Sequence, residues 1–286
     1  RLDIIPDPER HFILSEIEPM EPDPFYEELR QQVSRSPKKD LFVFIHGYNV
    51  SFESAALRTA QMKVDLEFAG AACFYSWPSQ GGLLQYTRDE ENVRYTVSHL
   101  RQFLLTLTKQ SGARSIHLIA HSMGNRAVTE VLKELRLELG KKRAKLFNEV
   151  ILAAPDVDAQ IFVKDIAPRI RETADRVTLY ASSNDRALIA SKIVHGYPRA
   201  GESGKGLVVV EGVETVDVSN IDCSLLGHSY YGDSKSVLTD LALVLRGQKP
   251  ALERTWLTPE EMSGLTFWKF SAAQFETARR MAQQLR

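Results

Sequence analysis

The chain has 286 residues, of which 43% are hydrophobic, and its 36 basic residues nearly balance its 37 acidic ones. This length and apolar content suffice for one large domain, and the balanced charge argues against a polyanion-binding surface. The only two cysteines, Cys73 and Cys223, are too few for a disulfide framework, and no CxxC pair indicates a metal site. No apolar run reaches the roughly 18 residues that a membrane-spanning helix needs. We therefore expect no nucleic-acid partner and no integral membrane segment.

Residues 1–40 are predicted to be a strand and helix extension that packs on the core. The stretch "RHFILSEIEPM" (10–20) is a candidate strand, and "DPFYEELRQQV" (23–33) is typical of a short helix with Pro24 near its start. The chain begins at Arg1 without methionine, so we expect a fragment or a processed product. The location of the protein stays open: the cytoplasm is favoured, and export is possible because a signal sequence could have been removed.

The core is predicted to span residues 41–250. Six short runs within it are apolar almost throughout, and helical patterns separate them; the runs are 41–47, 71–77, 115–122, 149–156, 176–183 and 206–212, and the helical patterns are 53–68, 88–110, 123–139, 160–174, 186–194 and 234–246. Continuous apolar runs of this length are typical of parallel strands buried on both faces. The alternation therefore predicts an α/β fold with a mostly parallel, doubly wound sheet and helices on both faces. Residues 251–286 are expected to be a helical tail, with one amphipathic helix over 271–285.

The stretch "HLIAHSMGNRAV" (117–128) places Ser122 where an apolar strand becomes a helix. This is the position of the nucleophile elbow, G-x-S-x-G, whose sharp turn demands small residues two before and two after the serine. Ala120 and Gly124 meet that demand, although alanine replaces the usual glycine. A helix N-cap is the alternative role for Ser122. The strand, the small residues and the following helix together favour a nucleophile.

A serine hydroxyl is a poor nucleophile and needs a base and an orienting acid. In this architecture the order along the chain is Ser, then Asp or Glu, then His. His228 in "LLGHSYYG" follows the last predicted strand and is the expected base. Asp185 in "YASSNDRAL" follows the strand before it and is the favoured acid, while Asp156 and Asp158 in "AAPDVD" remain alternatives.

Two backbone N–H groups are expected to form an oxyanion hole. One belongs to Met123, directly after the serine, and the other to Tyr48 in "FIHGYNVSF", where Gly47 allows a tight turn. His46 in the same loop is expected to orient it through ring hydrogen bonds.

The substrate pocket is predicted to be shallow, because the connections near the strand ends are too short for more than a small lid. The longest candidate wall is "WPSQGGLLQY" (77–86), in which Trp77 and Tyr86 supply apolar surface. Tyr230 and Tyr231, beside His228, are further candidates for the pocket. Ordinary packing is the alternative role for these aromatic side chains.

Six segments in order, "VFIHGYNVSFESAALRTAQ", "YSWPSQG", "HLIAHSMGNRA", "ILAAPDVDAQIF", "YASSNDRAL" and "LGHSYYGDS", resemble a bacterial α/β-hydrolase family of unknown function within the esterase/lipase superfamily. The resemblance covers about residues 10–250. It implies the α/β-hydrolase fold and a triad of Ser122, Asp185 and His228. It implies no particular substrate.

These residues predict a serine hydrolase, specifically a carboxylesterase that acts on short-chain or small acyl esters through an acyl-enzyme. The substrate would be a small molecule, and the chemistry requires no metal or organic cofactor. A thioesterase, an amidase or an acyltransferase would use the same triad. A non-catalytic α/β-hydrolase scaffold that binds a partner is a further alternative, whereas a Rossmann protein is disfavoured because no G-x-G-x-x-G follows the first strand. The oligomeric state stays open.

Overall fold

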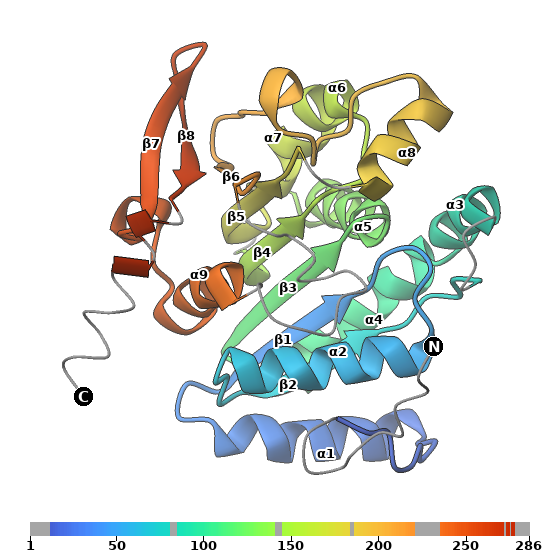
Figure 1. Cartoon of the computed structure of the whole chain (residues 1–286). Helices are drawn as coiled ribbons and strands as arrows, with labels where there is room; N and C mark the ends of the chain where they lie inside the picture. Colours follow the sequence, from blue (N-terminus) through green and yellow to red (C-terminus); the bar gives the residue numbers. More distant parts are fainter. Residues whose placement is uncertain are drawn as a thin grey trace, which may run out of the picture.

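The computed structural model describes residues 12–80, 85–140, 145–183, 186–220, 235–271, 273–274 and 276–277. Within these residues one eight-stranded sheet runs in the order β2-β1-β3-β4-β5-β6-β8-β7 (Figure 1). All neighbouring strands are parallel except β7 and β8. The strands are β1 (Asp40–Ile45), β2 (Ala71–Tyr75), β3 (Ser115–His121), β4 (Phe147–Ala153), β5 (Ala174–Ala181), β6 (Glu214–Asp217), β7 (Leu257–Met262) and β8 (Leu265–Phe270). The predicted doubly wound, mostly parallel sheet is thus confirmed.

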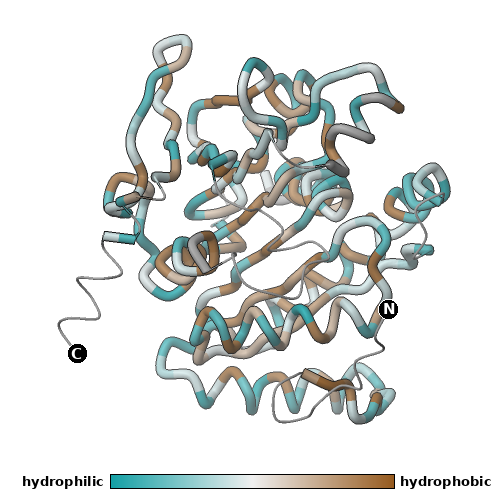
Figure 2. Tube along the Cα trace, viewed as in Figure 1, coloured by the Kyte–Doolittle hydropathy of each residue, from teal (hydrophilic) through white to brown (hydrophobic). Residues whose placement is uncertain are grey.

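Helices cover both faces of the sheet. They are α1 (Pro22–Arg35), α2 (Phe52–Asp65), α3 (Tyr86–Tyr95), α4 (Val97–Gln110), α5 (Gly124–Leu139), α6 (Ala159–Ile161), α7 (Ala167–Ile170), α8 (Arg186–His195) and α9 (Lys235–Gly247). Because successive side chains of a strand point to opposite faces, Leu41, Val43 and Ile45 pack with α1, α4 and α5, while Phe42 and Phe44 pack with α2 and α9. All six residues of β1 are buried, and hydrophobic residues concentrate along the central strands (Figure 2).

The last predicted strand of the core is misplaced. The apolar run 206–212 is not a strand; β6 begins after it, at Glu214. The run lies beside β6, where the Thr215 hydroxyl donates to the carbonyl of Val208 at 2.8 Å, and both Leu207 and Val208 are buried. Gly212, with a φ of 80°, then turns the chain into β6. A buried apolar run cannot be distinguished from a strand by its pattern alone, which accounts for the shift.

Two terminal predictions are also wrong. Residues 12–20, the described part of the predicted N-terminal strand, form no strand, and apolar side chains such as Phe12 and Ile17 are exposed there. The expected helical tail over 251–286 instead contains the hairpin β7–β8, which extends the sheet beside β6. Ser263 and Gly264, both with positive φ, form its two-residue turn. Most of the amphipathic helix predicted over 271–285 lies outside the described residues.

Arg254 ties this C-terminal part of the chain to the core. Its guanidinium is buried and donates to the carboxylates of Asp240 on α9, at 2.7 Å, and Glu214 on β6, at 2.8 Å. The Tyr180 hydroxyl, on β5, and the Trp256 indole N–H also donate to Asp240, at 2.6 and 2.7 Å. Asp240 is itself fully buried, so its carboxyl oxygens depend on these partners for hydrogen bonds.

The buried carboxyl group of Glu149 makes the stability of the fold depend on pH. Burial raises the pKa of Glu149 on β4 to about 8, although Arg176 lies 3.5 Å away and acts in the opposite direction. The folded state therefore holds a proton that the unfolded state has lost, and the free energy of unfolding should fall as pH rises from about 6.5 to 8, by at most about 1.4 kcal/mol per pH unit. Below about pH 6.5 the slope is mixed, because burial lowers the pKa of His117 to about 4 and stability is lost there as pH falls.

Urea unfolding of the wild type and of Glu149→Gln, measured across this upper pH range, checks this prediction. The free energy of unfolding of the wild type should fall steadily relative to that of Glu149→Gln as pH rises, because glutamine does not titrate. A difference that stays constant would mean that Glu149 is already ionised in the folded protein.

Candidate active site

Ser122 lies at the topological switch point of the sheet. The chain leaves β1 for β2 on one side and later returns to β3 on the other, so the carboxyl ends of β1 and β3 flank the position at which open α/β sheets generally bind ligands. Tyr48 follows β1, and Ser122 follows β3. A Cβ atom added at Gly47 would lie only 3.0 Å from the Cβ of Ser122, so the loop after β1 rests against the serine.

The backbone at Ser122 is strained in the way that a nucleophile elbow requires. Its φ is 48°, in the left-handed region that residues other than glycine seldom adopt. Helix α5 begins two residues later, and a Cβ atom at Gly124 would lie 2.4 Å from the carbonyl oxygen of His46. A larger residue at 124 would therefore push α5 away from the end of β1. Ala120, the other small position, is fully buried in β3.

Hydrogen bonds to β4 hold this strained turn. The N–H of Ser122 donates to the carbonyl of Ala153 at 3.0 Å, and the carbonyl of Ser122 accepts from the N–H of Asp156 at 3.2 Å. The buried amide of Asn125 donates to both Ser122 and Ala153 carbonyls, at 3.0 and 3.1 Å. Asn125 was not identified from the sequence, because an asparagine in the first turn of a helix is common and only the fold shows which carbonyls it reaches.

His46 and Trp77 form a scaffold beneath the loop after β1. The rings stack with centroids 5.1 Å apart; His46 Nδ1 lies 2.8 Å from the Gly47 carbonyl, and Nε2 lies 3.2 Å from the Trp77 N–H. A neutral ring that donates from Nδ1 satisfies both contacts, and burial lowers the pKa of His46. The Trp77 indole N–H donates to the His46 carbonyl at 2.8 Å, and Trp77 is only 2% exposed. This burial assigns Trp77 to the scaffold rather than to a pocket wall.

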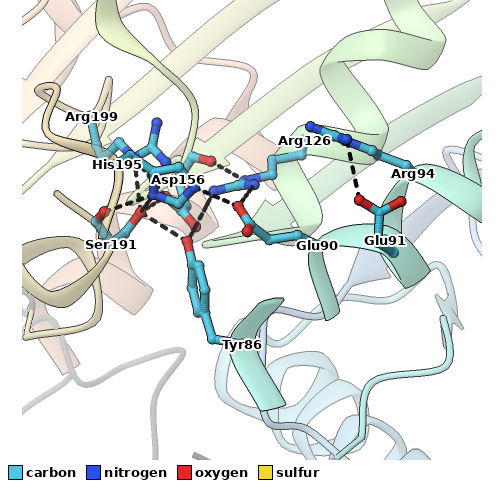
Figure 3. Close-up of polar contacts among 9 residues, drawn as sticks. All are labelled: Tyr86, Glu90, Glu91, Arg94, Arg126, Asp156, Ser191, His195 and Arg199. Atoms are coloured by element: carbon cyan, nitrogen blue, oxygen red, sulfur yellow. Dashed lines mark hydrogen bonds and ion pairs between the residues drawn. The ribbon is translucent and has the colours of Figure 1, made fainter. Parts of the chain in front are cut away.

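Seven residues near the elbow form a polar group that we call the Asp156 cluster: Tyr86, Glu90, Arg126, Asp156, Ser191, His195 and Arg199 (Figure 3). Asp156 lies at its centre and is 2% exposed. Its Oδ2 accepts from the Tyr86 hydroxyl at 2.6 Å and lies 3.1 Å from Arg126. Its Oδ1 accepts from the Ser191 hydroxyl at 2.5 Å and lies 3.1 Å from Arg199.

Glu90 connects Arg126 to His195 within the Asp156 cluster. Its carboxylate lies 2.6 Å from Arg126 and 2.5 Å from Nε2 of His195, whose Nδ1 lies 2.7 Å from the Ser191 carbonyl. Burial acts to raise the pKa of Glu90, but Arg126 and His195 outweigh it, so the pKa is lowered and the group is ionised. The cluster was not predicted as a unit, because its members come from α3, α5, the end of β4, α8 and the segment after α8.

The structure describes only part of the predicted site. Tyr86 is bound to Asp156, and its ring meets that of half-buried Tyr48 edge to face, with centroids 5.3 Å apart. Met123, whose N–H is the other predicted oxyanion donor, is buried directly before α5. Four further predicted residues lie outside the described residues; they are Asp185, His228, Tyr230 and Tyr231. Among the described residues no group of three or more His, Cys, Asp or Glu side chains could hold a metal ion, and none of the described helices is long and apolar enough to cross a membrane.

Three solved structures similar to this chain are esterases. Inhibited esterase B from Lactobacillus rhamnosis is 12% identical, with 73% of this chain and 78% of that chain covered and a TM-score of 0.40. A fungal esterase from Rhizomucor miehei is 10% identical, with 82% and 93% covered and a TM-score of 0.40, and an acetyl xylan esterase is 10% identical, with 73% and 97% covered and a TM-score of 0.39. No curated protein matches the chain.

A protein-family model matches residues 21–246, a range that includes the strands β1 to β6 and all of α9 except its last residue. That family is described as an alpha/beta hydrolase of unknown function, DUF900, and the match supports a hydrolase. The chain belongs to this α/β-hydrolase family and has its fold.

Proposed function

We propose that this protein is a serine hydrolase that cleaves small carboxylic esters through an acyl-enzyme. One observation carries the proposal: Ser122 is held in a left-handed conformation between β3 and α5, at the switch point of the sheet. Such strain persists only where the surrounding structure enforces it, and it is typical of functional residues. A serine that merely capped α5 would have an extended backbone instead.

The proposed reaction uses four kinds of group. The Ser122 hydroxyl oxygen bonds to the carbonyl carbon while His228 accepts its proton, and the N–H groups of Tyr48 and Met123 bind the resulting oxyanion. His228 then gives the proton to the departing alcohol as the ester bond breaks. Water then attacks the acyl-enzyme while His228 accepts a proton from it, and His228 returns that proton to the Ser122 oxygen as the acid product leaves. Asp185 holds the imidazole in the required tautomer and stabilises its charged form.

The contacts of the other two carboxylates support Asp185 as the acid. Asp156 is occupied by two arginines and two hydroxyl groups. Asp158 caps α6, because its Oδ1 accepts from the N–H groups of Gln160 and Ile161, both at 2.9 Å. Asp185 follows the end of β5 in the chain, and His228 follows the end of β6, so both come after strands whose carboxyl ends lie at the same edge of the sheet as Ser122.

Replacing Asp185 by asparagine is expected to lower kcat for p-nitrophenyl acetate by about 10⁴-fold, the loss seen when the acid of the reference serine triad is changed in this way. The amide would favour the wrong tautomer of the histidine. Steady-state kinetics check the loss, and Asp158→Asn is the matched control, since asparagine caps a helix as well as aspartate does. Full activity in Asp185→Asn would assign the acid to another residue.

The preferred acyl chain is expected to be short. Only the small helices α6 and α7 and one π-helical turn, Phe162–Ile166, lie between β4 and β5, so this connection holds no lid domain. The Tyr86 hydroxyl donates a hydrogen bond to Asp156, which holds the Tyr86 side chain in place. A shallow pocket buries few extra methylene groups, each worth about 0.8 kcal/mol when fully buried. The ratio kcat/KM should therefore be higher for p-nitrophenyl acetate or butyrate than for palmitate, with no jump in rate when the substrate forms an emulsion. A preference for palmitate with activation at the interface would contradict this prediction.

A matched panel of ester, thioester and anilide substrates with the same short acyl group tests the proposed reaction class. We expect the oxygen ester to be hydrolysed with the highest kcat/KM. A higher value for the thioester or the anilide would make the protein a thioesterase or an amidase with the same nucleophile. Hydrolysis of none of them would favour the non-catalytic scaffold.

A further inference from the structure

The Asp156 cluster joins the nucleophile elbow to the helix that follows the proposed acid. The N–H of Asp156 donates to the Ser122 carbonyl at 3.2 Å, and its carbonyl accepts from Nε of Arg126, on α5, at 2.7 Å. Through its side chain, Asp156 accepts a hydrogen bond from Ser191 on α8 at 2.5 Å. A single buried residue thus contacts both Ser122 and α8, and α8 begins at Arg186, the residue after Asp185.

The cluster also fixes α8 from two further directions. The Ser191 hydroxyl accepts from Nε of Arg199 at 2.8 Å, and Arg199 lies on the segment that pairs with Asp158 after β4. At the far end of the helix, His195 contacts Glu90 on α3 at 2.5 Å. Arg126 and Arg199 face Asp156 and Glu90, so charges of both signs are paired within a site that is largely closed to water. Arrangements of this kind hold one geometry, because any displacement would leave a buried charge without its partner.

We infer that Asp156 is a positioning residue, which holds the nucleophile elbow and α8, the helix that follows Asp185 in the chain, in one relative position during turnover. This inference rests on the proposed function for its catalytic consequence. The mechanical part, that Asp156 holds α8 in place, stands on the contacts alone. Small errors in the placement of catalytic groups reduce turnover strongly, even when they originate away from the reacting atoms.

Two substitutions and one control test the inference. Asp156→Asn replaces an acceptor by an amide that cannot pair with both arginines, and Ser191→Ala removes only the contact on α8. Lys192→Ala is the matched control on the same helix, because the Lys192 side chain is 48% exposed, pairs with Glu202 at 2.6 Å and is not part of the Asp156 cluster. Each variant is assayed for kcat and KM with p-nitrophenyl acetate, and for hydrogen exchange of the backbone amides of α8.

We expect Asp156→Asn to lower kcat by about 10²-fold, the scale of a misplacement of about 1 Å, with KM changed by less than about threefold. Ser191→Ala should lower kcat by about fivefold, as loss of one hydrogen bond would. Both variants should exchange the α8 amides faster than the wild type, and Lys192→Ala should change neither quantity. Because Ser191→Ala leaves the charges of the cluster paired, it keeps the test valid if Asp156→Asn does not fold.

Hydrogen exchange distinguishes a failure of the proposed function from a failure of the positioning inference. Faster exchange in α8 together with an inactive wild type would overturn the proposed function while leaving the positioning contact intact. An active wild type, with Ser191→Ala indistinguishable from Lys192→Ala in both kcat and exchange, would overturn the inference. A loss of about 10⁴-fold in Asp156→Asn, with normal turnover in Asp185→Asn, would also overturn it, because Asp156 would then be the acid of the triad.

Discussion

Replacing Ser122 by alanine is expected to lower kcat for p-nitrophenyl acetate by about 10⁵- to 10⁶-fold, the scale on which serine hydrolases lose turnover with their nucleophile. The substitution removes one oxygen atom and leaves the Cβ atom and the left-handed backbone unchanged. The hydrogen bonds that hold the turn, from Ser122 N–H to Ala153 and from Asp156 N–H to Ser122, involve backbone atoms and should survive. Activity should therefore disappear while the thermal unfolding temperature stays within a few degrees of the wild type.

A buried serine elsewhere provides the control for this result. Ser111 is fully buried at the end of α4, where its hydroxyl accepts from the N–H of Ala113 at 3.2 Å. Ser111→Ala should keep its turnover. Ester hydrolysis that persists in Ser122→Ala would show that another residue is the nucleophile.

Replacing Arg254 by methionine is expected to lower the free energy of unfolding by about 3–5 kcal/mol, the range for removing one partner of a buried ion pair. Methionine keeps much of the side-chain length but leaves the charge of Asp240 buried with only the hydrogen bonds from Tyr180 and Trp256. Glu214 loses a partner as well. Urea unfolding followed by circular dichroism measures the change.

An exposed ion pair gives the comparison for this second result. Arg246 lies 2.7 Å from Glu67, and both side chains are exposed to solvent, so Arg246→Ala should cost less than about 1 kcal/mol. Equal losses in the two variants would contradict the role of Arg254. Because Arg254 lies beyond residue 246, the last residue that the family model matches, a large loss would also show that the C-terminal segment contributes to the folding of this chain.

Local patterns explain which elements were predictable. The strands β1 to β5 were expected because each contains a short run that is apolar almost throughout, and β1 is buried along its whole length. The elbow at Ser122 was expected because its steric demand acts on residues two positions away. The hairpin β7–β8 was missed because β7, "LTPEEM", contains Pro259 and two glutamates, which is typical of an edge strand but not of a core strand.

Contacts between distant segments could not be predicted in the same way. Tyr86 and Ser191 meet at Asp156 although 105 positions separate them in the chain. No periodicity or motif marks such a contact, because the order of strands in the sheet brings the two helices together. The fold was thus accessible from local sequence patterns, whereas the group that surrounds Asp156 depends on tertiary structure.

The central claim is that Ser122 is an activated nucleophile, and labelling with a fluorophosphonate probe tests it most directly. An activated serine attacks the phosphorus atom, displaces fluoride and keeps the phosphonyl group, whereas an ordinary serine hydroxyl does not react. The labelled protein is digested, and mass spectrometry locates the adduct. We expect a single adduct on the peptide that contains Ser122, formed in parallel with the loss of ester hydrolysis. An adduct on a different residue that abolishes hydrolysis, or full inhibition with Ser122 unmodified, would contradict the claim.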